Sequence, residues 1–245
     1  MKRCAVCTLL LLLLAAGVAC AQATLLLTTE ESPPYNLRQG QEIGGSSTEK
    51  VRELMRRARQ PHRIELLPWK RAYELALEQP DTCVYSTTRT SEREGLFKWV
   101  GPIAFNEWVL FGRSEGGIRL STLEDARPYV IGAYLGDVRE EYLRSRGFRV
   151  ESVPSDAQNP RKLAMGRIDL WVSGRYDGPL LIAEAGLTGS VKALLTFQRT
   201  ELYLACNRQL PDGLIGELGR HAAALWREGL AAAIDARYER AATPR

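Results

Sequence analysis

The chain has 245 residues and a formal net charge of +4, from 33 basic and 29 acidic side chains. Two of the basic residues and none of the acidic ones lie in positions 1–23, so the remaining 222 residues carry a charge of only +2. A charge of that size does not indicate nucleic acid as a partner. A length of 222 residues allows one large domain or two small ones.

The first 23 residues have the pattern of an export signal. Lys2 and Arg3 precede an almost wholly apolar run over 4–19, and Ala21-Gln22-Ala23 supplies the small-x-small pattern that a signal peptidase reads. The run is short for a membrane span and ends in small residues, and no other stretch approaches membrane-spanning length. The pattern therefore predicts export to the periplasm rather than an uncleaved anchor.

We predict that the mature protein begins at or near Thr24. The alternative is lipidation at Cys20, because Val18-Ala19-Cys20 resembles part of a lipobox. Gly17 stands where a lipobox has leucine, which favours cleavage after the alanine pair. The intact mass of the exported protein measures the cleavage site, and a lipid-modified Cys20 would contradict the prediction.

The five cysteines fall into two groups. Cys4, Cys7 and Cys20 lie in the export segment, which leaves Cys83 and Cys206. An even pair in an oxidising compartment is the simplest case of a disulfide. The alternative is two unpaired buried thiols, a common state for cysteine. The pair lacks the C-x-x-C spacing of metal and redox sites.

The pattern after the export segment alternates strands with helices. Apolar runs over 25–29, 64–67 and 83–85 predict buried strands. The first helix is expected to open with a capping box, Ser46-Ser47-Thr48-Glu49, and the second to cover about 71–79. This order predicts a parallel sheet covered by helices.

A second unit is expected after the Gly116-Gly117 turn, beyond an apolar and aromatic stretch over 95–112. Gly136-Asp137 opens a helix with Asp137 and Glu140 in capping-box spacing. Because both halves show the same alternation, two similar α/β lobes are expected. The other elements predicted here are strands over 129–132, 168–172 and 202–206, helices over 160–165 and from Gly178-Pro179, and a helical tail from about 214 to 238.

No strong catalytic, metal-binding or cofactor-binding signal stands out in the sequence. The zinc-protease and phosphate-loop patterns are missing. The two histidines, His62 and His221, are expected at the surface. The sequence therefore predicts neither a metal nor a cofactor.

A polar cluster over 86–93, Ser-Thr-Thr-Arg-Thr-Ser-Glu-Arg, follows the strand that contains Cys83. Ligands of open α/β sheets bind beyond the carboxyl ends of the strands, where this cluster lies. Its hydroxyls suit neutral hydrogen bonds and an arginine suits a carboxylate. The alternative is a solvated loop with a helix N-cap at Thr90 or Ser91.

Motifs in a shared order make the chain resemble the family 3 periplasmic solute-binding proteins over nearly its whole mature length. Thr90-Ser91-Glu92-Arg93 matches a T-x-E-R stretch, and Gly166 to Leu170 matches G-x-x-D-a. Gly101-Pro102-Ile103 stands where the family has an aspartate-proline-aromatic triplet. The other matches are Pro33-Pro34-Tyr35, Ile43-Gly44-Gly45 through Val51, Gly136-Asp137 and Tyr203-Leu204-Ala205.

The resemblance implies a type II periplasmic-binding-protein fold, with a ligand cleft between two α/β lobes joined by two crossover strands. The first lobe would be 24–103 plus 203–245 and the second 104–202, with crossovers near 102–107 and 200–203. It also implies that Cys83 and Cys206 lie close together and form a disulfide.

The resemblance assigns ligand-binding roles as well. Arg93 would grip a carboxylate with help from Thr88 and from backbone N–H groups near Ser86. Tyr35 and Trp69 would form an apolar wall. Backbone N–H groups over 135–137, including those of Gly136 and Asp137, would offer the positive end of a helix to an anion.

One departure from the family concerns the group that holds an α-ammonium. Ser173-Gly174 occupies the stretch where amino-acid-binding relatives place an aspartate, and Asp177 comes a few residues too late to replace it. The acid of the first strand is displaced as well, with Thr29 in its place, and Glu30 is the substitute we expect. Ser173 is the residue expected at the ligand in this stretch.

Three functions remain open at this stage. The first is a monomeric protein that hands a small solute to an inner-membrane ABC permease or a sensor. The second is an enzyme on the same scaffold, such as a cyclic-acid dehydratase, with Glu30, Glu31 or Asp137 as general acid or base. The third is an interaction module without ligand turnover.

Overall fold

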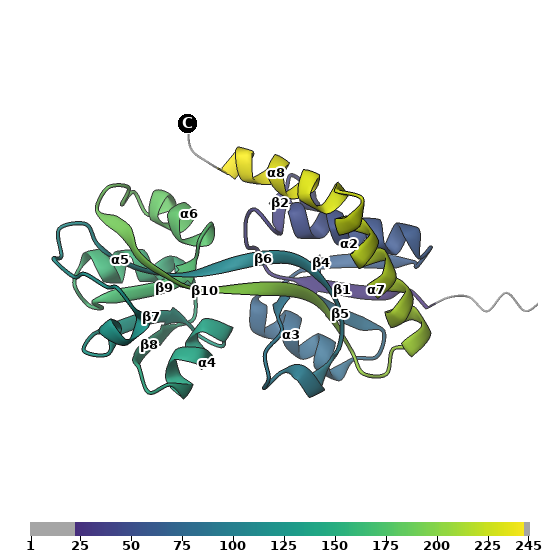
Figure 1. Ribbon diagram of the computed structural model, residues 1–245, viewed down its shortest axis with the longest axis horizontal. Coiled ribbons are helices and arrows are strands. Elements are labelled where there is room, and N and C mark those ends of the chain that lie inside the picture. The colour runs from purple at the N-terminus through teal and green to yellow at the C-terminus, as the bar shows by residue number, and fades with distance from the viewer. Residues whose placement is uncertain (1–22, 243–245) are drawn as a thin grey trace, which may run out of the picture.

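The computed structural model describes residues 23–242, with side chains through Arg240, so the predicted export signal and its cleavage site lie outside the described residues. Two lobes lie side by side and are joined by two long antiparallel strands (Figure 1). These are β6 (Lys98–Arg113) and β10 (Val191–Cys206). One eight-stranded sheet results, in the order β4-β1-β5-β10-β6-β9-β7-β8.

The first lobe is built around three parallel strands. β1 (Leu25–Thr29) lies between β4 (His62–Leu66) and β5 (Thr82–Thr88), as the strand–helix alternation predicts. All five residues of β1 are buried, which explains its unbroken apolar start. The helices of this lobe are α2 (Ser46–Arg57), α3 (Trp69–Glu78), α7 (Asp212–Arg227) and α8 (Leu230–Ala242), and its short elements are β2 (Leu37–Gln39), β3 (Glu42–Gly44) and η1 (Glu94–Leu96).

The second lobe repeats the plan at the other end of the same sheet. β7 (Val130–Tyr134) runs parallel to β8 (Arg149–Val153) and β9 (Leu170–Gly174), and β9 pairs antiparallel with β6. The helical elements of this lobe are η2 (Leu123–Ala126), α4 (Val138–Ser145), η3 (Asp156–Gln158), α5 (Asn159–Ala164) and α6 (Asp177–Glu184).

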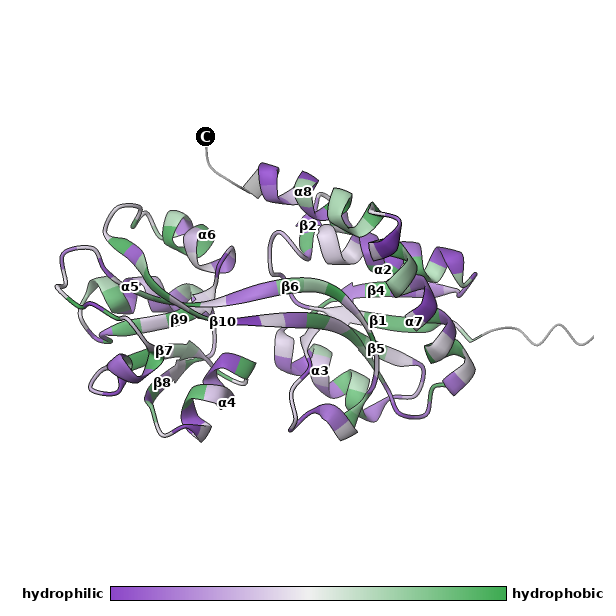
Figure 2. Ribbon diagram, viewed as in Figure 1, coloured by the Kyte–Doolittle hydropathy of each residue, from purple (hydrophilic) through white to green (hydrophobic). Residues whose placement is uncertain are grey.

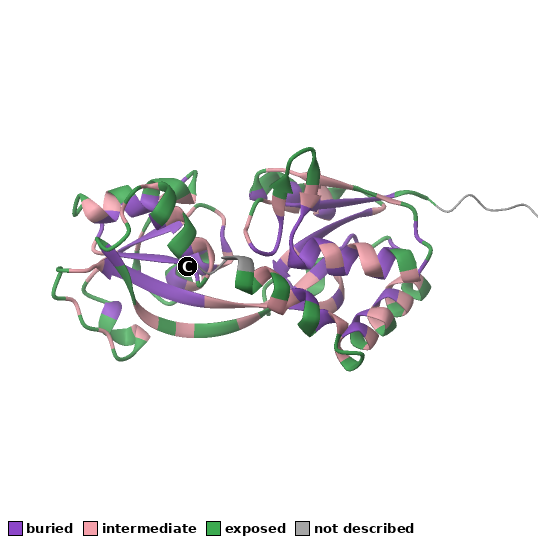
Figure 3. Cartoon of the chain, turned by 90° about the horizontal axis from the view of Figure 1, so that it is seen from above, coloured by how far each residue is buried: buried purple, intermediate pink, exposed green. Residues whose placement is uncertain are grey.

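Each lobe has its own apolar core, and the two strands that cross between the lobes are polar in their middle stretch. In Figure 3 the buried strands lie inside each lobe, with partly buried or exposed chain between. In Figure 2 the middle of β6 and of β10 is hydrophilic where these strands leave one lobe for the other. On β10 this stretch contains Gln198, Arg199, Thr200 and Glu201, none of which is buried. The two cores are therefore separate.

The capping box predicted at the start of α2 is not formed, so this prediction is wrong. Gly45 is the N-cap and no side chain caps the helix. The N–H groups of Ser46 and Ser47 instead donate to the carbonyl oxygens of Pro34 and Tyr35, both at 2.9 Å. Because the loop after β1 supplies these acceptors, the first turn needs no hydroxyl cap.

The predicted single helical tail consists of two helices. α7 ends at Arg227 and α8 begins at Leu230, with Gly229 between them at φ 75°. That left-handed conformation is readily adopted by glycine and ends a helix. The bend lets both α7 and α8 pack against α2.

The predicted disulfide between Cys83 and Cys206 is present. The two residues are directly opposite each other in the antiparallel pair of β5 and β10. Both are fully buried within the core of the first lobe. The bond ties the returning strand β10 to the strand that ends at the polar cluster. No helix over residues 23–242 has the length and apolar content of a membrane span.

Candidate functional site

A small cavity of about 40 Å³ lies between the two lobes. It receives side chains from the strand ends of the first lobe, from the starts of α4 and α6 in the second lobe, and from both crossing strands. The residues that line it are Glu30, Ser32, Tyr35, Asn36, Trp69, Tyr85, Ser86, Thr88, Arg93, Asn106, Trp108, Asp137, Val138, Arg139, Asp177 and Leu202.

Arg93 reaches this cavity from the turn that follows β5. Only 4% of the residue is exposed, and its guanidinium lies over the ring of Tyr73, 5.0 Å from the centroid. Its Nη2 donates to Glu141 Oε2 of α4 at 2.9 Å, across the gap between the lobes. Its Nη1 is buried and has no hydrogen-bond partner. An unpaired N–H of a buried guanidinium favours an acceptor from a bound molecule.

Arg89, the other arginine of the polar cluster, faces elsewhere. It pairs with Glu94 at the surface and stacks against the rings of Trp99 and Tyr203. It does not line the cavity. The geometry therefore separates the two arginines, which the sequence pattern alone does not.

Ser86 and Thr88 also line the cavity, from the end of β5. The strand continues through both residues, beyond the 83–85 run expected from the sequence. Ser86 has a left-handed backbone at φ 60°, and its hydroxyl donates to Asn36 Oδ1 at 2.6 Å. Asn36 was not selected from the sequence, and its side chain in turn donates to the carbonyl oxygen of Glu30 at 3.0 Å.

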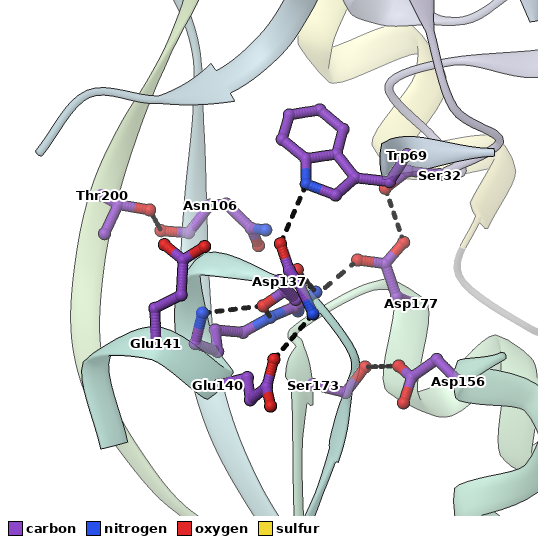
Figure 4. Close-up of polar contacts among 12 residues, drawn as sticks. Ser32, Trp69, Asn106, Asp137, Glu140, Glu141, Asp156, Ser173, Asp177 and Thr200 are labelled. Carbon is purple, nitrogen blue, oxygen red and sulfur yellow. Dashed lines mark hydrogen bonds and ion pairs between the residues drawn. The ribbon is translucent and has the colours of Figure 1, made fainter. Parts of the chain in front are cut away.

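Tyr35 and Trp69 contribute rings to the cavity wall, and their polar atoms have partners in the chain. The Tyr35 hydroxyl donates to the carbonyl oxygen of Phe105 at 2.6 Å. Trp69 Nε1 donates to the carbonyl oxygen of Gly136 at 3.2 Å, from the first lobe to the second (Figure 4). Their ring faces are thus what remains for a ligand. Tyr85 of β5 and Trp108 of β6 are the other aromatic residues of the wall.

The anion site expected at the start of α4 is closed by internal hydrogen bonds. The N–H groups of Leu135 and Asp137 donate to backbone carbonyls, at 3.0 and 3.1 Å. That of Gly136 donates to Glu140 Oε2 at 2.6 Å. Asp137 is the N-cap, and its carboxylate accepts from Arg139 N. Asp137 therefore caps the helix, but the predicted capping box is not formed, because Glu140 accepts from the N–H of Gly136 and the N–H of Asp137 donates to the carbonyl oxygen of Tyr134.

Acidic side chains lie around Arg139, a buried arginine beside the cavity. Asp137 accepts from Arg139 Nε and Nη2 at 2.7 and 2.8 Å. Asp177 Oδ2 lies 4.0 Å from Arg139 Nη1, and Asp177 Oδ1 accepts from Ser32 of the first lobe at 2.8 Å (Figure 4). Sequence reasoning missed Arg139, although its place two residues after the helix cap was a usable signal.

Asp177 reaches the cavity despite its late position in the chain. A Cβ built at Gly174 would lie 2.4 Å from Asp177 Oδ2. Because Gly174 has no side chain, the Asp177 carboxylate occupies that space from the first turn of α6. The expectation that Asp177 comes too late for the site is wrong for this reason.

Burial and repulsion perturb the carboxyl groups at this site. Burial, with the nearby charges of Asp137 and Asp177, raises the pKa of Glu30 well above its usual range. Burial raises the pKa of Asp177 to about 6. Although burial opposes its charge, the pair with Arg139 holds the pKa of Asp137 below its usual value.

Two residues selected from the sequence lie away from the cavity wall. The Ser173 hydroxyl donates to Asp156 Oδ2 at 3.0 Å, so it positions that carboxylate instead of facing the cavity (Figure 4). Glu31 is exposed and accepts from the N–H of Arg38. No group of three or more His, Cys, Asp or Glu side chains suited to a metal occurs within residues 23–242.

Comparison with solved structures identifies the fold. A histidine kinase sensor domain with similarity to periplasmic binding proteins matches with a TM-score of 0.80 and 21% identity, over 89% of this chain and 96% of that one. The chain has the two-lobed fold of type II periplasmic binding proteins. A mutant of ArgBP from T. maritima matches this fold with a TM-score of 0.74 and 16% identity, over 88% of this chain and 94% of that one.

ArtJ, an arginine-, lysine- and histidine-binding protein from Geobacillus stearothermophilus, matches with a TM-score of 0.73 and 12% identity, over 88% of this chain and 95% of that one. No family model matches the chain, and no curated protein matches its sequence. The periplasmic-binding-protein fold is therefore established by three-dimensional similarity.

Proposed function

We propose that the chain is a periplasmic solute-binding protein that encloses a small polar solute with a carboxylate between its lobes. The observation that carries this proposal is Arg93, a nearly fully buried arginine at the cavity with Nη1 unpaired. A guanidinium presents parallel N–H donors that match a carboxylate. Ser86 and Thr88 add hydroxyls at the same strand end.

Three contacts between the lobes support enclosure of the solute. Arg93 pairs with Glu141, Ser32 with Asp177 and Trp69 with the carbonyl of Gly136. All three span the gap beside the cavity, so they close the lobes over whatever the cavity holds. Binding and closure are thus coupled through the same residues.

The partner that receives the solute is an inner-membrane permease or a sensor. Solved structures of this fold include a histidine kinase sensor domain, which supports a sensor, and the substrate-binding protein of an amino acid ABC transporter, which supports a permease. The export pattern of residues 1–23 supports a periplasmic location. The lobe boundaries in this proposal are 24–103 and 203–245 for the first lobe and 104–202 for the second.

A thermal-shift screen of amino acids, amines and organic acids tests the proposal. At least one carboxylate-bearing compound should raise Tm, since a ligand at about 100 times its Kd stabilises the folded state by about 2.7 kcal/mol. The compound should be recovered unchanged after prolonged incubation. Its conversion to a product would instead support an enzyme on this scaffold. Stabilisation by amines alone would contradict carboxylate binding.

A further inference from the structure

We propose that Arg139 is the second lobe's contact with the bound solute, and that the solute is a small dicarboxylate with one acidic group on Arg93 and the other on Arg139. This inference rests on the proposed carboxylate site at Arg93. It adds the chemical class of the solute and the residue that selects it.

The first observation is the pair of unpaired guanidinium nitrogens. In the part of the chain that the structure describes, four buried side-chain nitrogen or oxygen atoms have no hydrogen-bond partner. Two of them are Arg93 Nη1 and Arg139 Nη1, and both residues line the same cavity from opposite lobes. Buried N–H groups without partners are unfavourable, so a solute that brings an acceptor to each of them would satisfy both.

The second observation is how each guanidinium is held. Arg139 donates through Nε and Nη2 to the two carboxylate oxygens of Asp137, which fixes the plane of the group. Its Nη1 lies 4.0 Å from Asp177 Oδ2, beyond hydrogen-bond distance. Arg93 is held by a single hydrogen bond, from Nη2 to Glu141 Oε2. Each arginine is thus oriented by one carboxylate and keeps its Nη1 for a ligand.

The third observation is the space at Gly174. A Cβ there would lie 3.2 Å from Arg139 Nη1 and 3.3 Å from Asn106 Nδ2, in addition to its clash with Asp177. Glycine at this position therefore lets the Arg139 guanidinium reach the cavity. The amide nitrogen of Asn106, another cavity residue, lies beside the same space and adds a donor for an acidic group.

The carboxyl groups around Arg139 are compatible with a second anion. The charge of Asp137 is balanced by its ion pair with the Arg139 guanidinium. Burial raises the pKa of Glu30, of Asp156 and of Asp177, that of Asp177 to about 6. An anion beside them raises these pKa values further, so they take up protons on binding, and a protonated carboxyl donates to a carboxylate. A cationic solute would instead require these carboxyl groups to be ionised.

Isothermal titration calorimetry with a panel of dicarboxylates (succinate, glutarate, L-aspartate and L-glutamate) tests the proposal. Succinate and 4-aminobutyrate form the matched pair, because the second replaces one carboxylate with an ammonium group. At least one dicarboxylate should bind the wild type, and 4-aminobutyrate and L-arginine should bind at least about tenfold more weakly. Titration at pH 7 in two buffers of different ionisation enthalpy should show proton uptake with the dicarboxylate.

Arg139→Gln should lower dicarboxylate affinity about tenfold or more, because the neutral amide cannot pair with the second acidic group. The double variant Asp137→Asn/Arg139→Gln should lose dicarboxylate affinity to the same extent. It avoids leaving the Asp137 carboxylate buried without a partner. The matched control is Arg144→Gln on the same helix, whose side chain is half exposed, pairs with Glu140 and does not line the cavity. It should bind like the wild type.

Tighter binding of 4-aminobutyrate or L-arginine than of every dicarboxylate would overturn the proposal, as would wild-type dicarboxylate affinity in both Arg139 variants. Either result would leave the proposed function intact, provided that binding still depends on Arg93. Failure of the proposed function has a different signature, which is binding that Arg93→Ala does not weaken.

Discussion

Replacing Arg93 with alanine should reduce solute affinity more than any other single change in the cavity. The ligand carboxylate would lose its charged partner in a buried site, which costs about 2–5 kcal/mol. Arg93→Lys should also bind poorly, because an ammonium group does not reproduce the two parallel donors of the guanidinium. Calorimetric titration with the solute identified by screening measures both losses.

Two matched variants separate the roles of Arg93. Arg89→Ala removes the other arginine of the cluster, which lies at the surface with Glu94, and should leave affinity unchanged. Glu141→Gln removes the pair between the lobes but leaves Arg93 in place, so it should weaken binding less than Arg93→Ala. Near wild-type affinity in Arg93→Ala together with a loss in Arg89→Ala would place the ligand carboxylate at Arg89 and contradict its assignment to Arg93.

Removing the disulfide should produce the largest loss of stability. The bond joins residues 123 positions apart, and cross-linking a loop of this length restricts the unfolded chain strongly. The Cys83→Ala/Cys206→Ala variant should therefore be about 2–5 kcal/mol less stable. Urea unfolding measures this as a lower midpoint. Reduced wild-type protein should unfold near the same midpoint as the variant.

Thiol labelling provides an independent test of the bond. Mature protein that is denatured without reduction should contain no reactive thiols, because Cys83 and Cys206 are the cysteines that remain after the predicted cleavage. Two labelled thiols would contradict the disulfide. Because both cysteines are buried in the core of the first lobe and neither lines the cavity, the double variant should bind the solute with little change.

Much of the fold was accessible from local patterns in the sequence. A continuous apolar run is typical of a strand that is buried on both faces, and Leu25, Leu26 and Leu27 form such a strand. Pro33 and Pro34 mark the turn that follows it. The alternation of such runs with amphipathic segments predicts parallel strands with helical crossovers in each lobe, and the structure has them. Helix ends were harder to predict. The start of α2 depends on acceptors from the loop after β1, and the end of α7 depends on the left-handed backbone of Gly229.

The sequence by itself identified the polar strand end that contains Ser86, Thr88 and Arg93, since strand ends and residue types are local properties. Only the tertiary structure decided which side chains meet there. Arg139 and Asp177 enter the cavity because Gly174 leaves space, and Ser173 turns to Asp156. Such convergence depends on packing between lobes that are far apart in the chain, and no local pattern records it.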